Sequence, residues 1–354
     1  MAQINKPTDY FNTVLYTGNG TAIGSGGNAI TGVGFQPDWT WIKSRTQVEE
    51  HEVFDVIRGV TKYVRPSTTQ AEVTDSESLT SFDSDGFTVG NHGQVNANSQ
   101  SFASWNWLAS NTTSSNTDGS ITSTVSANTT SGFSIGTYAG SASSITVGHG
   151  LGAIPKMIIC KCTDTSATNW QVYHAGIGNG YRIYLNLTNA QELNSNAWDN
   201  TTPTSSVFTL GTAGDGNYPG RNFVFYAFAE KKGFSKFGSY TGNGSTDGTF
   251  VYTGFKPAFT ILKRTDAIGG WIIVDNKRDT FNVAGKFLYA HDSGAEQDLI
   301  SSHTPLDFLS NGMKMRSSNL TGTTSLNISG ASYIYMAFAE SPLVGTNNTP
   351  ATAR

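Results

Sequence analysis

Short runs in which apolar and polar residues alternate occur along the whole chain. In Trp39–Lys43, WTWIK, the first, third and fifth side chains fall on one face of an extended strand, and the other two on the opposite face. Turn signals separate such runs, and the pairs Asp85-Gly86 and Asn311-Gly312 are typical of tight hairpins. No stretch has the sustained 3.6-residue period of an amphipathic helix. The pattern therefore predicts an all-β chain of short strands.

Similar opening and closing sequences occur three times along the chain. The openings are YTGNG (16–20), YAGSA (138–142) and YTGNG (240–244), and the closings are WNWLAS (105–110), FYAFAE (225–230) and YMAFAE (335–340). Such self-similarity indicates a tandem array. Each unit contains about six to eight predicted strands, which favours an antiparallel β-sandwich. We therefore expect three tandem antiparallel β-sandwich repeats.

The composition between these units suggests where the domains begin and end. We expect an N-terminal segment (1–12), repeat 1 (13–110), a Ser/Thr/Asn-rich linker (111–132), repeat 2 (133–232), repeat 3 (233–343) and a polar C-terminal tail (344–354). The segment 1–12 would be either an arm that attaches to another protein or a frayed end. Because the segment 111–132 has almost no apolar residues, it is expected to isolate repeat 1 from the others.

Charge and composition narrow the classes of partner. Charged residues make up 14% of the 354 residues and the formal net charge is −4, with no basic stripe, so no nucleic-acid partner is expected. No run of about 20 apolar residues is long enough for a membrane-spanning helix, and the N-terminus lacks the apolar core of a secretory signal. Cys160 and Cys162, the only cysteines, are expected to be small core residues of one strand.

The candidate chemical motifs favour structural roles over catalytic ones. Asp83-x-Asp85-Gly86 resembles the start of a calcium loop, but the later acidic ligands are missing, so a plain turn is expected. Asp-x-x-Arg recurs at Asp55 and at Asp275, and its equivalent placement in two repeats favours a structural ion pair. No nucleophile elbow, P-loop or zinc-protease motif occurs. We therefore expect no enzyme activity, no catalytic residue, no metal site and no cofactor.

Exposed aromatic rings in loops are the best candidates for binding. Trp198, Tyr218, Asn91 and His92 lie in predicted loops, and planar Trp or Tyr rings with Asn or Asp side chains suit the faces and hydroxyls of sugars. These four residues are the candidate carbohydrate contacts. The other six tryptophans lie in strand patterns and are expected to be core residues; they are Trp39, Trp41, Trp105, Trp107, Trp170 and Trp271.

The ordered phrases also resemble a known family. From about residue 13 to the last residue, phrases such as GFQPDWTWIKSR, GHGLGAIPKMIICK, SKFGSYTGNGSTDGTFVYTGFKP and YIYMAFAE are similar to those of marine bacteriophage tail-fibre or structural proteins. The resemblance implies lectin-like sandwiches of the jelly-roll, concanavalin-A-like type, and a place in the virion. It brings no catalytic residues with it. The chain lacks the long N-terminal anchoring domain and shaft that such fibres often have, which suits a compact tip, a capsid protrusion or an adaptor.

These observations together predict a non-enzymatic phage virion protein. We expect it to be made in the host cytoplasm without a signal peptide, to contact other virion proteins, and to be displayed outward as a tail fibre tip or spike that binds host-surface polysaccharide. Analogy with fibres favours a homo-oligomer, a trimer. The first alternative is a purely architectural capsid-decorating or tail-adaptor subunit, and the second is a polysaccharide depolymerase.

Overall fold

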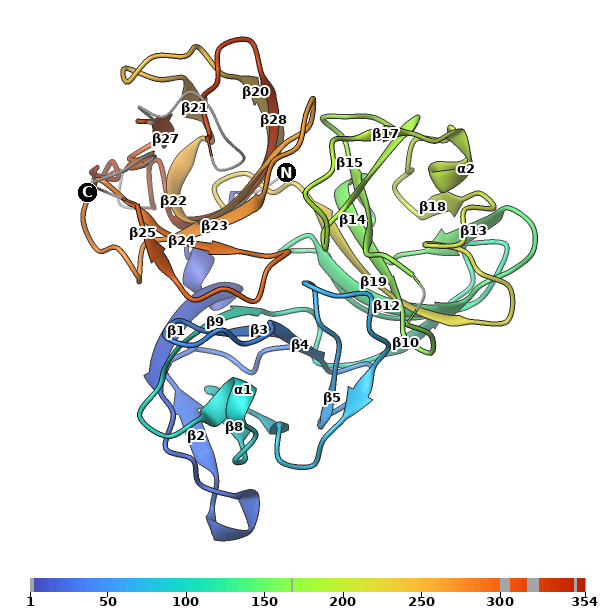
Figure 1. The fold of residues 1–354 in the computed structure, drawn as a ribbon. Helices are drawn as coiled ribbons and strands as arrows, with labels where there is room; N and C mark the ends of the chain where they lie inside the picture. Colours follow the sequence, from blue (N-terminus) through green and yellow to red (C-terminus); the bar gives the residue numbers. More distant parts are fainter. Residues whose placement is uncertain (1–2, 167, 300–305, 317–324, 347–348, 354) are drawn as a thin grey trace.

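The computed structural model describes residues 3–166, 168–299, 306–316, 325–346 and 349–353. The chain forms three lobes around a common centre, which we call lobe 1 (11–107), lobe 2 (114–229) and lobe 3 (235–342) (Figure 1). Strands dominate the described residues, and the strand pairs within the sheets are antiparallel, as the alternating pattern predicted. No described helix is both long and apolar enough to cross a membrane.

Each lobe has one large sheet, and the three large sheets share the same strand order. The sheet of lobe 1 has the order β1 (Phe11–Thr17), β9 (Ser101–Trp107), β3 (Trp39–Ser44) and β4 (Glu52–Asp55). In lobe 2 the order is β10 (Ser114–Asn116), β11 (Ser123–Asn128), β12 (Phe133–Ala139), β19 (Asn222–Ala229), β14 (Pro155–Cys162), β15 (Gln171–His174), β16 (Tyr181–Tyr184) and β17 (Glu192–Leu193). In lobe 3 it is β20 (Ser235–Thr241), β28 (Ser332–Pro342), β22 (Phe255–Arg264), β23 (Trp271–Asp275), β24 (Lys286–Tyr289) and β25 (Gln297–Asp298). Each lobe thus has an opening strand (β1, β12 or β20) that pairs with the closing strand (β9, β19 or β28). The closing strand pairs in turn with β3, which contains WTWIK, or with its equivalent, β14 or β22.

A smaller sheet covers the outer face of each large one. These sheets are β2 (Asn28–Thr31), β8 (Gly86–Val89) and β7 (Leu79–Asp83) in lobe 1; β13 (Ile145–Gly148) and β18 (Val207–Leu210) in lobe 2; and β21 (Phe250–Tyr252), β27 (Gly312–Met315) and β26 (Leu306–Leu309) in lobe 3. The short strands β5 (Lys62–Tyr63) and β6 (Val73–Thr74) form a further pair. The helical turns are η1 (Pro7–Asp9), η2 (Ile23–Ser25), α1 (Gly93–Asn96) and α2 (Ser195–Trp198).

A tight hairpin joins β7 and β8, and its turn residues are Ser84 and Asp85, one position before the predicted Asp85-Gly86 pair. Asp83 pairs with Gly86, and the Asp85 carboxylate accepts hydrogen bonds from the backbone N–H groups of Gly32 and Gly34. Gly86 has a φ of 152°, which residues with a side chain rarely adopt. Asp85 therefore closes a turn.

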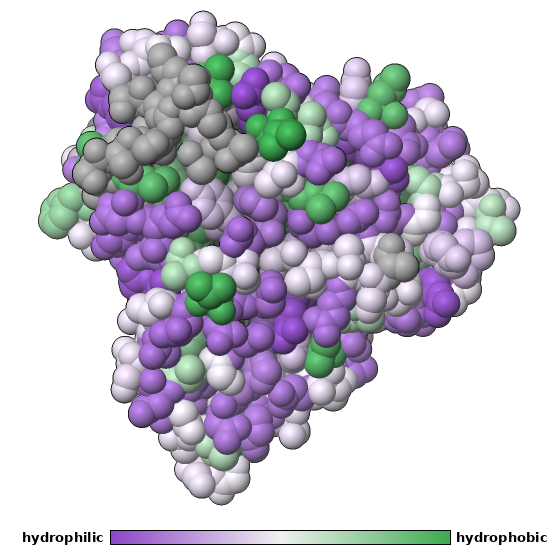
Figure 2. All heavy atoms as spheres, viewed as in Figure 1, coloured by the Kyte–Doolittle hydropathy of each residue, from purple (hydrophilic) through white to green (hydrophobic). Residues whose placement is uncertain are grey.

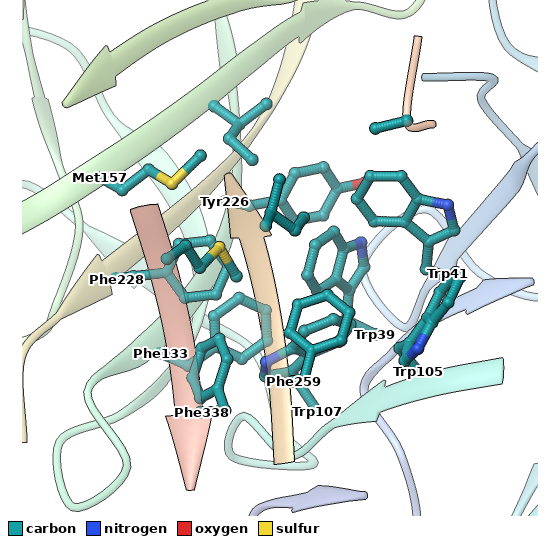
Figure 3. Close-up of a cluster of buried hydrophobic side chains, with 14 of the residues drawn as sticks. Trp39, Trp41, Trp105, Trp107, Phe133, Met157, Tyr226, Phe228, Phe259 and Phe338 are labelled. Carbon is teal, nitrogen blue, oxygen red and sulfur yellow. The ribbon is translucent and has the colours of Figure 1, made fainter. Parts of the chain in front are cut away.

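Each large sheet lies between two hydrophobic cores. Its outer face packs on a core of its own lobe, whereas its inner face joins a core shared by all three lobes. Trp39 and Trp41 point to the shared core and Ile42 points to the core of lobe 1, as the alternation of WTWIK predicted. The six tryptophans expected to be core residues are all at most 2% exposed. In Figure 3, aromatic rings from all three lobes meet in the shared core.

The segment 111–132 is not the isolating linker that its composition predicted, and lobe 1 shares a core with the other lobes. The segment 111–132 contains β10 and β11, and β11 pairs along its length with β12 of lobe 2. Val125 is 3% exposed in the core of lobe 2, and Ser123 and Ser126 are also buried. The expected linker is therefore largely part of the lobe 2 sheet. Small hydroxyl side chains are sufficient at the edge of a sheet, so the low apolar content was misleading.

The N-terminal segment packs against the body of the protein. Ile4 is buried and its N–H donates to the carbonyl of Lys232 at 3.0 Å, while Phe11 is 1% exposed in the shared core. The Gln3 side chain donates to the carbonyl of Val344 at 2.7 Å. From Gln3 onward, the segment expected to be an arm or a frayed end is therefore docked on the protein itself.

Two rings of polar contacts join the lobes through the shared core. The strands β4, β15 and β23 occupy equivalent places in the three large sheets. In the first ring, a side chain at the start of each of these strands reaches a backbone carbonyl of a neighbouring lobe. These contacts are His51 Nε2 to Tyr289 O (2.9 Å), Trp271 Nε1 to Tyr184 O (2.8 Å) and Trp170 Nε1 to Arg65 O (3.0 Å). They link lobe 1 to lobe 3, lobe 3 to lobe 2 and lobe 2 to lobe 1, so the ring is closed.

The second ring is formed by the last residues of β4, β15 and β23, which are Asp55, His174 and Asp275. Asp55 pairs with Arg58 at 2.6 Å and Asp275 with Arg278 at 2.5 Å, both within a lobe and buried, as expected of structural ion pairs. The other contacts cross between lobes: Tyr226 Oη donates to Asp55 (2.8 Å), Trp105 Nε1 donates to Asp275 (3.1 Å), and His174 Nε2 contacts Tyr335 O (3.1 Å). The molecule thus has an internal, approximate threefold arrangement.

The two cysteines are buried, as predicted. Cys160 and Cys162 carry free thiols in the core of lobe 2. Burial raises the pKa of the Cys160 thiol to about 12 and that of Cys162 to about 11, so both are protonated at neutral pH.

Candidate functional site

The four candidate carbohydrate contacts lie in two different lobes. Asn91 and His92 belong to lobe 1, whereas Trp198 and Tyr218 belong to lobe 2. They therefore do not form one site, and each has to be judged from its own surroundings.

Trp198 is a core residue, which contradicts the prediction of a loop ring open to solvent. It ends α2, is 1% exposed, and packs in the core of lobe 2 against Tyr173 and Phe208. The Asn194 side chain caps α2 by accepting from the N–H of Asn196. This single turn of helix directs the indole inward, although the polar sequence NSNAWDN around it gives no sign of burial.

His92 is held in an ion network. Its Nε2 lies 3.0 Å from a carboxylate oxygen of Glu52, and its Nδ1 lies 2.9 Å from one of Asp75. Burial opposes the charged imidazolium, but the hydrogen bond and negative charge of Glu52 outweigh it and raise the pKa of His92. The N–H of Asn91 donates to Glu77. Both ring nitrogens of His92 are therefore engaged in holding the structure of lobe 1.

Tyr218 lines a pocket in lobe 2, which we call the Tyr218 pocket. The pocket has a volume of about 400 Å³, within the range of small-molecule sites. Tyr218 is 48% exposed, as its predicted loop position suggested. The described lining residues are mostly polar: Thr165, Thr168, Arg182, Asn194, Asn196, Thr212, Ala213, Gly214, Asp215, Tyr218 and Arg221.

A braced loop carries Tyr218. The loop 211–221 follows β18, and the buried Asn217 side chain ties it to the segment 141–143 and to its own first residue. The Asn217 amide donates to the carbonyls of Ser143 (2.8 Å) and Gly211 (2.7 Å), and its oxygen accepts from the N–H of Ser141 (2.7 Å). Because these bonds fix the backbone beside it, the Tyr218 ring is presented from a well-ordered position.

A charge network forms one wall of the pocket. Arg182 donates to Glu192 at 3.1 and 3.2 Å and to Asp215 at 3.4 Å, and its guanidinium lies 4.9 Å from the Tyr184 ring centroid. Asp215 also accepts from Tyr184 Oη (2.8 Å) and from the N–H of Asn169 (2.7 Å). Burial, followed by the Asp215 charge, raises the pKa of Tyr184, so that this hydroxyl remains a donor.

Arg221 is the unpaired cation of the pocket. It is exposed, and its guanidinium makes no hydrogen bond or ion pair with any residue that the structure describes. An exposed aromatic ring, amide and hydroxyl groups and a free guanidinium thus surround one cavity. This set can stack on a ring-shaped ligand and hydrogen-bond to its hydroxyl or oxyanion groups.

The carboxylate of the pocket lining is engaged in hydrogen bonds. Within the described lining, Asp215 is the only carboxylate, and its oxygens are already bound by Arg182, Tyr184 and Asn169.

The companions of Tyr218 were not predicted from the sequence. Arg182 comes from β16, Asn194 precedes α2, Asn196 lies in α2, and Arg221 lies in the loop after β18, so the pocket exists only after folding. The one local sign of a binding site was the loop sequence GTAGDGNYPGR (211–221). It places an aromatic residue among glycines and ends with an arginine.

Comparison with known proteins identifies the family of the chain. No curated protein and no solved structure matches it. A family model described as "Domain of unknown function (DUF7483)" matches residues 6–342. Since this match covers all three lobes, the chain belongs to the DUF7483 family.

Proposed function

We propose that this protein is a non-enzymatic component of a bacteriophage particle, displayed on its surface as a tail fibre tip or spike, and that it binds host-surface glycans. The observation that carries the binding function is the Tyr218 pocket, where an exposed ring lies beside amide, hydroxyl and guanidinium groups. The place in the virion rests on the resemblance of the repeated phrases to phage fibre and structural proteins.

We further propose that each lobe is a jelly-roll sandwich of the concanavalin-A-like type. The pairing of a large and a small sheet around a core in every lobe supports this assignment. A homotrimer and contacts with other virion proteins remain predictions, and the mass of the purified protein in solution will test the trimer.

The first experiment is adsorption of the labelled protein to host-range bacteria. Tyr218→Ala and Arg221→Gln should each weaken saturable binding by about tenfold, since a tenfold change corresponds to about 1.4 kcal/mol of lost contact energy. Soluble surface polysaccharide should compete with binding of the unchanged protein. Phe281→Ala is a matched control, because Phe281 is another exposed ring (78%) but belongs to lobe 3.

The alternatives have distinct outcomes in the same experiment. Undiminished adsorption of Tyr218→Ala would reject the Tyr218 pocket as the binding site. Absence of adsorption for every form of the protein would favour the architectural subunit. Shortening of the polysaccharide during incubation would favour the depolymerase.

A further inference from the structure

A second cavity lies between lobes 2 and 3, and we call it the lysine cavity. It has a volume of about 530 Å³. Its lining includes Lys156 of β14, Lys231 and Lys232 of the turn between the lobes, Lys236 of β20 and Tyr252 of β21. Four of the 22 basic residues of a chain with net charge −4 thus line a single cavity.

The positive charge of this cavity is only partly neutralised by the protein. Glu230 is the single acidic residue among the described lining, and it pairs with Lys236 at 2.7 Å. The Lys231 ammonium donates to the carbonyl of Thr129. The ammonium groups of Lys156 and Lys232 make no hydrogen bond or ion pair with any described residue, so both can bind an incoming anion.

Apolar surface accompanies these cations. Tyr252 is 56% exposed and Ile154 is 46% exposed, and both line the cavity together with Ala153 and Ala229. An aromatic ring and an aliphatic side chain can contact a ring-shaped ligand, while nearby ammonium groups act as point charges for its oxyanion. A simple inorganic anion would use the lysines and leave the apolar surface uncovered.

We propose that the lysine cavity is a second binding site, and that its ligand is a ring-bearing oxyanion such as a sugar carrying a carboxylate or a phosphate group. Lys156 and Lys232 bind the oxyanion, and Tyr252 with Ile154 contacts the ring. The site is independent of the Tyr218 pocket, which lies within lobe 2 and is lined by different residues. An experiment can therefore reject one of the two proposed sites without affecting the other.

The test is calorimetric titration of the full chain with three defined probes. Trigalacturonate carries carboxylates, glucose 6-phosphate carries a phosphate, and galactotriose is uncharged. We expect at least one anionic probe to bind and galactotriose not to bind at this site, with affinity that decreases as salt increases. Comparison of the two anionic probes distinguishes a carboxylate ligand from a phosphate ligand.

Variants connect the binding to the cavity. The double change Lys156→Gln and Lys232→Gln should weaken binding of the anionic probe by about tenfold or more, and Tyr252→Ala should weaken it as well. Lys277→Gln removes an exposed lysine elsewhere in lobe 3 and should leave affinity unchanged. The proposal fails if neither anionic probe binds, if the double variant binds like the unchanged protein, or if Lys277→Gln has an equal effect.

Discussion

His51, His149 and His174 are each buried with both ring nitrogens engaged. In every case Nδ1 accepts from an N–H group, of Trp41, Leu151 or Gly176, while Nε2 faces a backbone carbonyl. The partners therefore require a neutral ring with the proton on Nε2. Burial lowers the pKa of His149 and of His174 to about 4, and it lowers that of His51 well below its usual value.

This arrangement predicts that acid destabilises the protein. The unfolded chain protonates these histidines near pH 6.5, whereas the folded chain resists until about pH 4, so the free energy of unfolding decreases as pH falls through this window. His92 acts oppositely, because its pKa is raised and its contribution is lost as pH rises through the folded value. Among the described histidines, four have a lowered pKa, since that of His291 is also lowered to about 4, and they outweigh the one raised pKa.

Urea denaturation between pH 7 and pH 5 measures the effect. Each histidine that only the unfolded chain protonates contributes up to about 1.4 kcal/mol per pH unit, a limit approached below the unfolded pKa. His174→Asn should reduce the slope, since it removes one such group. An identical slope in this variant would show that His174 does not titrate on unfolding.

For single aromatic residues, the sequence predicts burial well in strands and poorly in loops. The alternation in WTWIK correctly identifies Trp39 and Trp41 as core residues, because a strand repeats every two residues and leaves little choice of face. Trp198 lies in a polar segment, and only the α2 turn and the space beneath it decide that its ring is buried. Tyr218 was predicted to lie in a loop, but its pocket depends on contacts distant in sequence.

At the scale of elements, the closing strands β9, β19 and β28 explain why repeat 2 lacks the Asp-x-x-Arg pair. Trp105 of β9 and Tyr226 of β19 each donate to a buried aspartate of a neighbouring lobe. The equivalent residue of β28, Met336, has no such donor. The residue facing β28 is His174, which uses the backbone carbonyl of Tyr335 instead. An aspartate therefore ends the strand where the neighbouring lobe supplies a hydrogen-bond donor, and a histidine ends it where the neighbouring lobe supplies a backbone carbonyl.

Two substitutions in β9 test the value of these contacts. Trp105 and Trp107 are both at most 1% exposed in the shared core, but only Trp105 has its indole N–H bonded, to Asp275; that of Trp107 has no partner in the described structure. Trp105→Phe should therefore destabilise the protein by about 1–3 kcal/mol more than Trp107→Phe, because it leaves a buried carboxylate with fewer partners. Equal or reversed losses in urea denaturation would contradict this assignment.

The segment 111–132 shows what patterning does not determine at this scale. Its Ser/Thr/Asn composition is equally compatible with a solvated linker and with strands at the edge of a sheet. Backbone pairing of β11 with β12 decides between them, and that pairing needs no apolar side chain at most positions. The strands with strong alternation were predictable, whereas the pairing partners of β10 and β11 were not.

At the scale of the molecule, the shared core joins the three lobes into one cooperative unit. Trp39 contacts Trp107 within lobe 1 and the rings of Phe133, Tyr226 and Phe228 from lobe 2. Phe11 of lobe 1 stacks with Phe338 of lobe 3 at a centroid distance of 5.1 Å. Unfolding of any one lobe would expose these faces of the other two. The lobes should therefore unfold together.

Scanning calorimetry of Trp41→Ala tests this cooperativity. The substitution should cost about 3–5 kcal/mol, because it removes a fully buried ring, and it should shift a single transition of the whole chain. Loss of lobe 1 alone, seen as a separate early transition with the rest unchanged, would show that the lobes are energetically independent.

The docked N-terminal segment has a consequence for chain connectivity. The Gln3 side chain reaches the Val344 carbonyl, so the two ends of the folded body are adjacent, and the lobes close into a ring around one core. In such a ring the two covalent connections between lobes and the gap between residues 344 and 3 occupy equivalent positions. A circular permutant with residues 344 and 3 joined by a short peptide, and opened between the exposed Asn111 and Thr112, should therefore fold to the same three lobes. The order in which ribosomes deliver the repeats is then separable from the architecture they build.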